Sequence, residues 1–251
     1  LMPEIEKRPQ DVSSARLMVA TGEAFPVDIK KRLAAAAPNI GLYTFYAQTE
    51  AGFITGLRPE EQASHPESCG RPVPAIDVRI VDENMNDLPR GEVGEIICRC
   101  GLPGTMSMPE YWRNPEATKN AFHEGGLRTG DLGVVDEEGF VTILDRKKNI
   151  IIRGGENIAC LDVEGALHTH PDVIEACAFS VPDPRLGEVV GASVQTRDGK
   201  PLTQADMAAH LDARLAKFKI PEKLWCQDGP LTRGATDKID RRAIRAACLD
   251  T

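Results

Sequence analysis

Long apolar segments are missing from this sequence, and so is an excess of positive charge. No run within the 251 residues reaches membrane-spanning length, and none has the pattern of a signal peptide. The 30 Lys and Arg residues are outnumbered by 38 Asp and Glu residues, so the formal net charge is −8. Because an acidic chain repels nucleic acid phosphates at long range, nucleic acid is a poor candidate for its partner. We therefore expect a cytoplasmic protein that neither spans a membrane nor binds nucleic acid.

Clusters of cysteine are missing as well. The seven cysteines are scattered, and Cys98 and Cys100 form the closest pair. No second Cys or His pair follows them, whereas structural zinc sites are usually built from two such pairs. The sequence therefore predicts buried, reduced thiols rather than a metal site.

What is present is an ordinary globular composition, with 41% hydrophobic and 27% charged residues over a length that suits two domains. An apolar run at residues 16–20 predicts a buried strand close to the start of the chain, so we expect the chain to enter in the middle of a domain. A helix is predicted between Pro26 and Pro38, and another strand at 42–46. This order is typical of an α/β layer.

Between about residues 68 and 144 the sequence pattern changes to short predicted strands separated by glycine and proline. These strands are predicted at 77–81, 95–99, 134–135 and 140–144, which indicates a small antiparallel β subdomain.

Residues 149–251 have the pattern of a separate α+β domain. Strands are predicted at 149–153, 173–181 and 189–196, and Thr203 with Asp206 forms a capping box ahead of a helix. The charged stretch 145–148 is the predicted link between the two domains.

Five short motifs offer nucleotide chemistry, although each has an ordinary structural alternative. In Tyr46–Glu50 the ring can stack on a base, a hydroxyl can bond a phosphate and a carboxylate can hold Mg²⁺, but such a run is more often a polar strand end. Asp131 can accept ribose hydroxyls or simply occupy a β-turn. Arg146 can bond ribose or phosphate, or belong to a solvated linker.

The last two motifs lie in the second predicted domain. Gly154 and Gly155 permit close approach of a ligand to the backbone, or form a hairpin turn. Lys238 can neutralise a phosphate, or be an ordinary surface lysine.

The order of these motifs resembles the adenylate-forming superfamily of acyl-CoA synthetases, adenylation domains and luciferases. The resemblance covers nearly the whole chain and is carried by residues 21–26, 46–50, 68–72, 91–96, 111–118, 128–132, 145–146, 153–158 and 170–173. It implies a partial large domain at residues 1–145, made of an α/β remnant and the β subdomain at about 68–144. A small α+β C-terminal domain at 149–251 is implied to follow it.

The resemblance also implies a role for each matched residue. Those of the large domain would bind the nucleotide and its metal: Gly22, Glu23 and Ala24 on the adenine side, Tyr46 stacked on adenine, Thr49 on the α-phosphate, Glu50 on Mg²⁺ and Asp131 on the ribose. Those of the linker would be Arg146 beside the ribose and Lys148 at the interdomain hinge. Those of the second domain would be Gly154 and Gly155 along the pantetheine channel, and Lys238 as the catalytic lysine.

The implied reaction joins a carboxylic acid to CoA, with ATP, Mg²⁺ and CoA as cofactors and AMP and pyrophosphate as products. A fatty acid is the expected substrate. Two alternatives stay open, namely an adenylation domain that serves a carrier protein and a nucleotide-binding module without catalysis. The oligomeric state is not indicated.

Four departures from the family pattern qualify this expectation. Ala47, Asp145 and Asp237 each stand where the family usually has glycine, and the chain holds no Ser/Thr/Gly-rich loop ending in Lys-Gly that could wrap the triphosphate. We therefore expect these 251 residues alone to be inactive.

Overall fold

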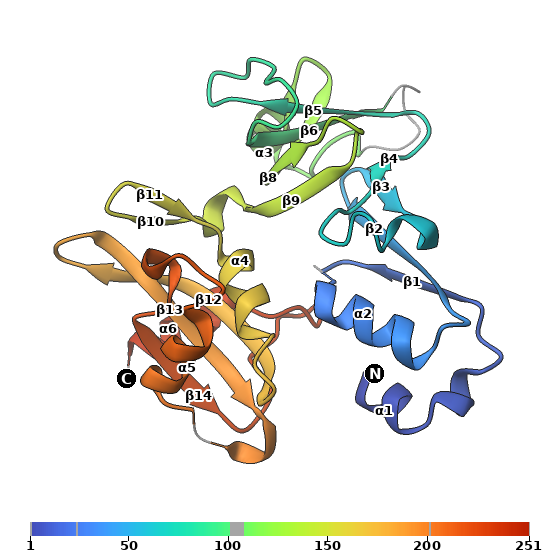
Figure 1. The fold of residues 1–251 in the computed structure, drawn as a ribbon. Helices are drawn as coiled ribbons and strands as arrows, with labels where there is room; N and C mark the ends of the chain where they lie inside the picture. The colour runs from blue at the N-terminus through green and yellow to red at the C-terminus, as the bar shows by residue number, and fades with distance from the viewer. Residues whose placement is uncertain (1, 24, 101–107, 201, 251) are drawn as a thin grey trace. The chain divides into compact units, whose positions relative to one another are not determined.

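The fold is given by a computed structural model that describes residues 2–23, 25–100, 108–200 and 202–250 (Figure 1). The chain divides into two compact units, Leu1–Leu144 and Asp145–Thr251. Short 3-10 helices accompany the main elements at Pro9–Val12, Pro59–Glu61, Lys147–Asn149, Arg197–Gly199 and Lys217–Lys219. In the part of the chain that the structure describes, no helix is both long enough and apolar enough to cross a membrane.

The first unit begins with a four-stranded sheet in the order β1 (Leu17–Thr21), β2 (Gly41–Gln48), β3 (Gly52–Leu57) and β4 (Arg71–Pro72). Strands β1 and β2 are parallel and are connected through α2 (Val27–Ala36), while the other pairs are antiparallel. Helix α1 (Met2–Lys7) packs against α2. The α/β layer predicted for this part of the chain is confirmed. The predicted burial of its first strand is wrong, because β1 is at the edge of the sheet and leaves Leu17 58% and Val19 51% exposed.

The alternation of side chains along β2 decides where its functional residues point. Leu42, Thr44 and Tyr46 are buried, because every second residue of a strand lies on the same face. Phe45 lies on the other face, where its ring centroid is 4.9 Å from that of Phe53. Tyr46 therefore enters the protein interior just where the strand ends.

The second sheet of this unit has the order β5 (Ile76–Val81), β6 (Gly94–Cys100), β8 (Gly126–Val135) and β7 (Phe122–His123), and β9 (Val141–Arg146) pairs with β8. The pairs β5–β6, β6–β8 and β7–β8 are antiparallel, and α3 (Pro115–Ala121) precedes β7. The predicted antiparallel β subdomain is confirmed.

A glycine joins the two sheets of the first unit. Gly70 adopts φ 97°, and a Cβ there would lie 2.0 Å from the carbonyl of Gly56. This close approach allows Gly70 to pair with Val141 of β9, while the Ser68 hydroxyl donates to Val141 O at 2.7 Å. A side chain at position 70 is therefore excluded by both space and backbone conformation.

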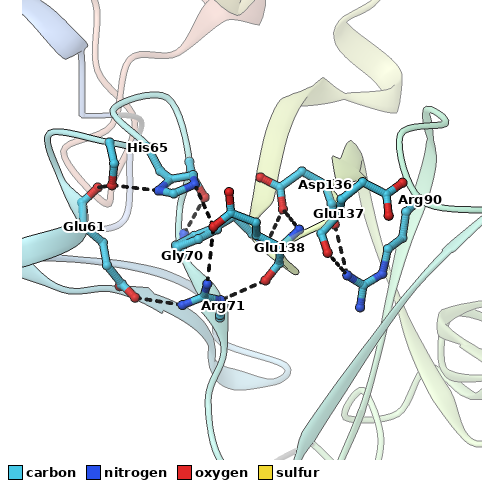
Figure 2. Close-up of polar contacts among 11 residues, drawn as sticks. Glu61, His65, Gly70, Arg71, Arg90, Asp136, Glu137 and Glu138 are labelled. Carbon is cyan, nitrogen blue, oxygen red and sulfur yellow. Dashed lines mark hydrogen bonds and ion pairs between the residues drawn. The ribbon is translucent and has the colours of Figure 1, made fainter.

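The neighbouring Arg71 reinforces this junction (Figure 2). Its guanidinium donates to Glu61 Oε1 and to Glu138 O, both at 3.0 Å, and lies 3.8 Å above the centre of the Phe140 ring. These contacts combine an ion pair with a cation–π interaction, so Arg71 fastens the β8–β9 turn to the first sheet.

The second unit is built on one five-stranded sheet in the order β11 (Glu156–Ile158), β10 (Ile151–Arg153), β13 (Gly187–Thr196) and β12 (Val173–Asp183), with β14 (Lys223–Gln227) parallel to β13. Its helices are α4 (Cys160–Leu167), α5 (Gln204–Leu211) and α6 (Arg241–Leu249). The predicted capping box at Thr203 and Asp206 opens α5 and is confirmed.

Alternating residues of β12 supply two separate cores. Ala176 and Ala178 belong to the cluster that includes Met207 of α5, whereas Phe179 belongs to the cluster that includes Ile244 of α6. Because neighbouring residues of a strand point to opposite faces, the two helices cover opposite sides of the sheet.

The seven cysteines form no disulfide bonds. Cys98 and Cys177 are buried, and burial raises the pKa of each thiol to about 12. The prediction of buried thiols is wrong for Cys226, which is exposed because it lies on the edge strand β14.

A buried ion pair ties α6 to α4. Arg241 Nη1 donates to Glu164 Oε1 at 2.6 Å and to Ala178 O at 2.9 Å, and the two charged side chains are 23% and 13% exposed. Burial raises the pKa of the Glu164 carboxyl to about 7, although Arg241 opposes the shift. Both groups are therefore charged at pH 8.

Replacement of Arg241 by methionine is expected to lower the free energy of unfolding of the second unit by about 3–5 kcal/mol at pH 8, because it leaves the Glu164 carboxylate buried without its partner. Urea unfolding of the 251-residue chain measures this, with Trp225 fluorescence as the signal in a Trp112→Phe background. Arg242→Met on the exposed side of α6 is the matched control. The double variant Arg241→Met/Glu164→Met should recover much of the loss, and a loss below about 1 kcal/mol in the single variant would contradict the role of the pair.

Candidate functional site

The carboxylate of Asp131 is the centre of a buried polar cluster in the first unit. Asp131 lies in β8 and is 4% exposed. Its Oδ2 accepts a hydrogen bond from the Tyr46 hydroxyl at 2.6 Å and another from Gln48 Nε2 at 2.7 Å. The structure thus brings together two residues that the sequence places 85 positions apart.

Burial raises the pKa of the Tyr46 hydroxyl well above its ordinary value, and the negative charge of Asp131 adds to the shift. The hydroxyl is therefore a permanent donor to the carboxylate. The Tyr46 side chain is 8% exposed and packs in the core of the β subdomain. Adenine stacking on Tyr46 and ribose binding by Asp131 stay predictions, and a ribose hydroxyl would have to share or replace the donors already on Asp131.

Gln48 and Thr129 belong to this cluster although sequence reasoning gave them no role. Gln48 Nε2 also donates to Thr129 O at 3.0 Å, and the Thr129 hydroxyl lies 3.1 Å from Asp131 N. Both residues lie within the matched motifs at 46–50 and 128–132, and this was the signal that could have identified them.

Glu50 follows β2 and faces a different partner. Tyr111 donates its hydroxyl to Glu50 Oε1 at 2.9 Å, and Met108 N donates to Glu50 O at 2.7 Å. Burial, followed by the Glu50 contact, raises the pKa of Tyr111. Tyr111 therefore keeps its hydroxyl proton as the donor to Glu50, and the two hydrogen bonds join Glu50 to the segment at 108–111.

The described residues include no group of three or more His, Cys, Asp or Glu side chains arranged around a metal position. A single carboxylate nevertheless fits Mg²⁺, which is commonly held by one or two carboxylates together with substrate phosphates and water. Glu50 is partly exposed and Thr49 beside it is exposed, so both are open to a ligand.

The predicted adenine-side loop follows β1. Gly22 has φ 97°, which glycine adopts without strain, and both Gly22 and Glu23 are exposed. The predicted site residue Ala24 lies outside the described residues.

In the second unit, the carboxylate of Asp145 organises the predicted linker. Asp145 is 1% exposed, and its Oδ1 accepts hydrogen bonds from Arg146 N at 2.6 Å and from Asn149 Nδ2 at 3.1 Å. Its Oδ2 accepts from Leu161 N at 3.0 Å, in the first turn of α4. Asp145 therefore caps this helix and encloses the predicted hinge residue Lys148, an arrangement that glycine at 145 could not make.

The hinge and ribose-side candidates of this linker are both accessible. Arg146 and Lys148 are exposed, and Lys148 lies in the single 3-10 turn at Lys147–Asn149.

Gly154 and Gly155 form the turn of the hairpin between β10 and β11. Their φ angles are 57° and 93°, and both residues are exposed. No atom lies within 4 Å of a Cβ added at Gly155, whereas Leu186 would lie 3.1 Å from one added at Gly154. The turn explains the glycine pair structurally and leaves its backbone accessible, as the predicted pantetheine contact requires.

Lys238 follows a tight turn just ahead of α6. Gly234 N donates to Lys238 O at 2.8 Å and Asp237 N donates to Gly234 O at 3.0 Å. Asp237 has φ 62°, the left-handed conformation that explains why the family favours glycine there. Lys238 itself is exposed. The turn therefore keeps its shape with aspartate at 237.

The predicted site residues thus form two sets. The structure brings Tyr46 of β2 and Asp131 of β8 into direct contact. Thr49 and Glu50 directly follow β2. Arg146, Lys148, the glycine pair and Lys238 lie on the linker and loops of the second unit.

Family models match the chain in two places. The AMP-binding enzyme model matches residues 2–112, and the AMP-binding enzyme C-terminal domain model matches residues 162–235. Crotonobetaine/carnitine–CoA ligase of Citrobacter koseri is 37% identical over 209 residues, covering 82% of this chain and 40% of that protein. Oxalate–CoA ligase of Saccharomyces cerevisiae is 39% identical over 209 residues, covering 82% of this chain and 37% of that protein. The chain therefore spans about two fifths of the length of these relatives.

Solved structures agree with this match. Amide bond synthetase McbA from Marinactinospora thermotolerans superposes with a TM-score of 0.84 at 35% identity, covering 95% of this chain and 49% of that one. O-succinylbenzoate coenzyme A synthetase from Bacillus subtilis, in complex with ATP and magnesium ion, gives a TM-score of 0.81 at 31% identity, covering 92% of this chain and 46% of that one. The chain therefore belongs to the AMP-binding, adenylate-forming enzyme family.

Proposed function

We propose that the chain is part of an AMP-forming acyl-CoA ligase, in which it supplies residues of the AMP-binding domain and of the C-terminal domain. The observation that carries this proposal is the identity of 37–39% over 209 residues with two CoA ligases. We call the complete ligase to which the chain would belong the full-length protein.

The first half-reaction forms an acyl-adenylate. A substrate carboxylate oxygen attacks the α-phosphorus of ATP, and the bond to the bridging oxygen of pyrophosphate breaks. Glu50 would hold Mg²⁺, which would supply positive charge against the phosphates. Asp131 orients the ribose, Thr49 bonds the α-phosphate, and Lys238 stabilises the negative charge that develops there.

The second half-reaction transfers the acyl group. The thiol sulfur of CoA attacks the acyl carbonyl, its proton passes to solvent, and AMP leaves. We assign the Gly154–Gly155 turn to the pantetheine arm, because its backbone is accessible. Rotation of the second unit about Lys148 would exchange Lys238 for this turn between the two steps.

A medium- or long-chain fatty acid is the proposed substrate. The names of the relatives indicate other acids as alternatives. Carnitine and oxalate ligases act on small polar acids, so the tested acids must include those classes. The acceptor is also open to test, because the amide bond synthetase neighbour suggests an amine and the adenylation-domain alternative a carrier-protein thiol.

Pyrophosphate exchange on the full-length protein tests the proposal. Exchange should depend on an added carboxylic acid from a panel of fatty, aryl, dicarboxylic and betaine acids. The adenylate should then react with CoA faster than with a carrier-protein arm or an amine. Absence of exchange with every acid would favour the nucleotide-binding module, and transfer to another acceptor only would exclude a CoA ligase.

The 251-residue chain alone is expected to form no acyl-CoA with any of these acids, because it holds no loop that could wrap the triphosphate. It should still bind AMP weakly, and Asp131→Ala should abolish this binding in calorimetric titration. Acyl-CoA formation by the chain alone at the full-length rate would contradict the proposed division of the active site.

A further inference from the structure

The turn that carries Lys238 is fastened to the sheet of the second unit by a series of side-chain contacts. Glu175 of β12 accepts hydrogen bonds from Leu231 N at 2.8 Å through Oε2 and from the Arg233 guanidinium through Oε1. Arg233 also donates through Nη1 to Asp237 O at 2.7 Å. This carbonyl belongs to the peptide bond between Asp237 and Lys238, so the series ends on the backbone of the lysine.

The ion pair in this series is partly exposed to solvent. The Glu175 side chain is 18% exposed and that of Arg233 is 32% exposed. A β-bulge interrupts the pairing of β12 with β13 between Val173 and Glu175, and bulges commonly redirect a side chain next to a functional site. The sheet therefore presents Glu175 at a position from which it holds the segment leading to Lys238.

Backbone hydrogen bonds alone do not fix the direction of the turn. The bonds Gly234 N to Lys238 O and Asp237 N to Gly234 O lie inside the turn, so they set its shape. Leu231 and Ile239, on either side of the turn, belong to the core that includes Phe179 of β12. Arg233 adds a link within the turn itself, because its planar guanidinium contacts Glu175 and the Asp237 carbonyl at the same time. A rigid fork of donors can make both contacts, whereas the ammonium of lysine acts as a point charge.

We propose that Glu175 and Arg233 are positioning residues for Lys238, an inference that rests on the adenylation role proposed above. The lysine ammonium acts only when it lies against the reacting phosphate, and a displacement of about 1 Å can cost about 10²-fold in rate. Glu175 and Arg233 hold the Lys238 peptide in one place on the sheet, so the flexible side chain searches a smaller volume.

The experiment compares both half-reactions in the full-length protein for Arg233→Lys and Glu175→Gln. Acyl-adenylate formation, followed by pyrophosphate exchange, should fall about tenfold or more in each variant. Conversion of supplied acyl-adenylate and CoA to acyl-CoA should keep the parental rate, since Lys238 takes no part in it. Arg242→Lys, at an exposed position of α6, is the matched control and should leave both rates unchanged.

A double-variant comparison separates positioning from general damage. In a Lys238→Ala background, Arg233→Lys should slow adenylation no further, because its effect passes through the lysine. The positioning role would be overturned if Arg233→Lys slowed adenylation by the same factor in the Lys238→Ala background as in the parent. It would also be overturned if Arg233→Lys slowed both half-reactions equally or slowed neither. If Lys238→Ala alone adenylates at the parental rate, the proposed catalytic assignment falls together with this inference. If Lys238→Ala is slow while Arg233→Lys is unimpaired, the positioning role falls alone.

Discussion

Replacement of Lys238 by alanine in the full-length protein is expected to slow acyl-adenylate formation by roughly 10²–10³, the effect of losing one electrostatic donor to a transition state. Adenylation gathers negative charge on the α-phosphate and on the departing pyrophosphate. An ammonium that reaches this charge stabilises the transition state more than the ground state, so its loss lowers the rate of the chemical step.

The same variant should leave the second half-reaction largely intact. Acyl transfer to CoA starts from an adenylate that is already made, and release of acyl-CoA from a synthetic adenylate measures it alone. Asp237→Gly is the companion variant and should adenylate at the parental rate or faster, because glycine adopts φ 62° without strain. Adenylation at the parental rate by Lys238→Ala would show that Lys238 is an ordinary surface lysine.

Replacement of Lys148 by proline is expected to separate the two half-reactions by at least about tenfold, or about 1.4 kcal/mol. Proline fixes φ near −65°, so the backbone at 148 can no longer rotate between two conformations. Lys148 lies in the 3-10 turn that Asp145 encloses through its hydrogen bonds to Arg146 N and Asn149 Nδ2. Proline at 148 would therefore restrict the backbone between Arg146 and Asn149, both of which are hydrogen-bonded to Asp145.

Rates of pyrophosphate exchange and of acyl transfer from supplied adenylate measure this effect. Lys148→Ala is the control, since alanine removes the side chain but leaves φ free, and it should impair neither step by more than a few-fold. An equal loss of both half-reactions in Lys148→Pro, or no loss of either, would argue against a hinge at this residue.

The local sequence pattern was sufficient to predict many of the helices and strands. The helix between Pro26 and Pro38, the capping box of α5 and the short strands of the β subdomain follow from periodicity and turn residues, which act within a few positions of the chain. The expectation of buried thiols was wrong at Cys226, because the position of β14 at the edge of its sheet depends on the order of the strands.

The contacts of the candidate site were less accessible to sequence reasoning. Glu175 and Arg233 are 58 positions apart, and Asp145 reaches Leu161 across 16. Asp145 was treated in the sequence as a mild departure from glycine, yet its buried carboxylate caps α4 and organises the linker. Such pairings follow from strand register and helix placement, which local propensity does not determine.

The sequence by itself determined the succession of elements and the residue types available to a nucleotide, because both depend on short segments and their order. The tertiary structure decided which of these residues meet. It placed the Tyr46 hydroxyl and Gln48 on Asp131, and it joined Glu175 through Arg233 to the peptide of Lys238. The physical reason is that a carboxylate buried at a sheet must find donors wherever packing brings them, and packing joins segments that lie far apart along the chain.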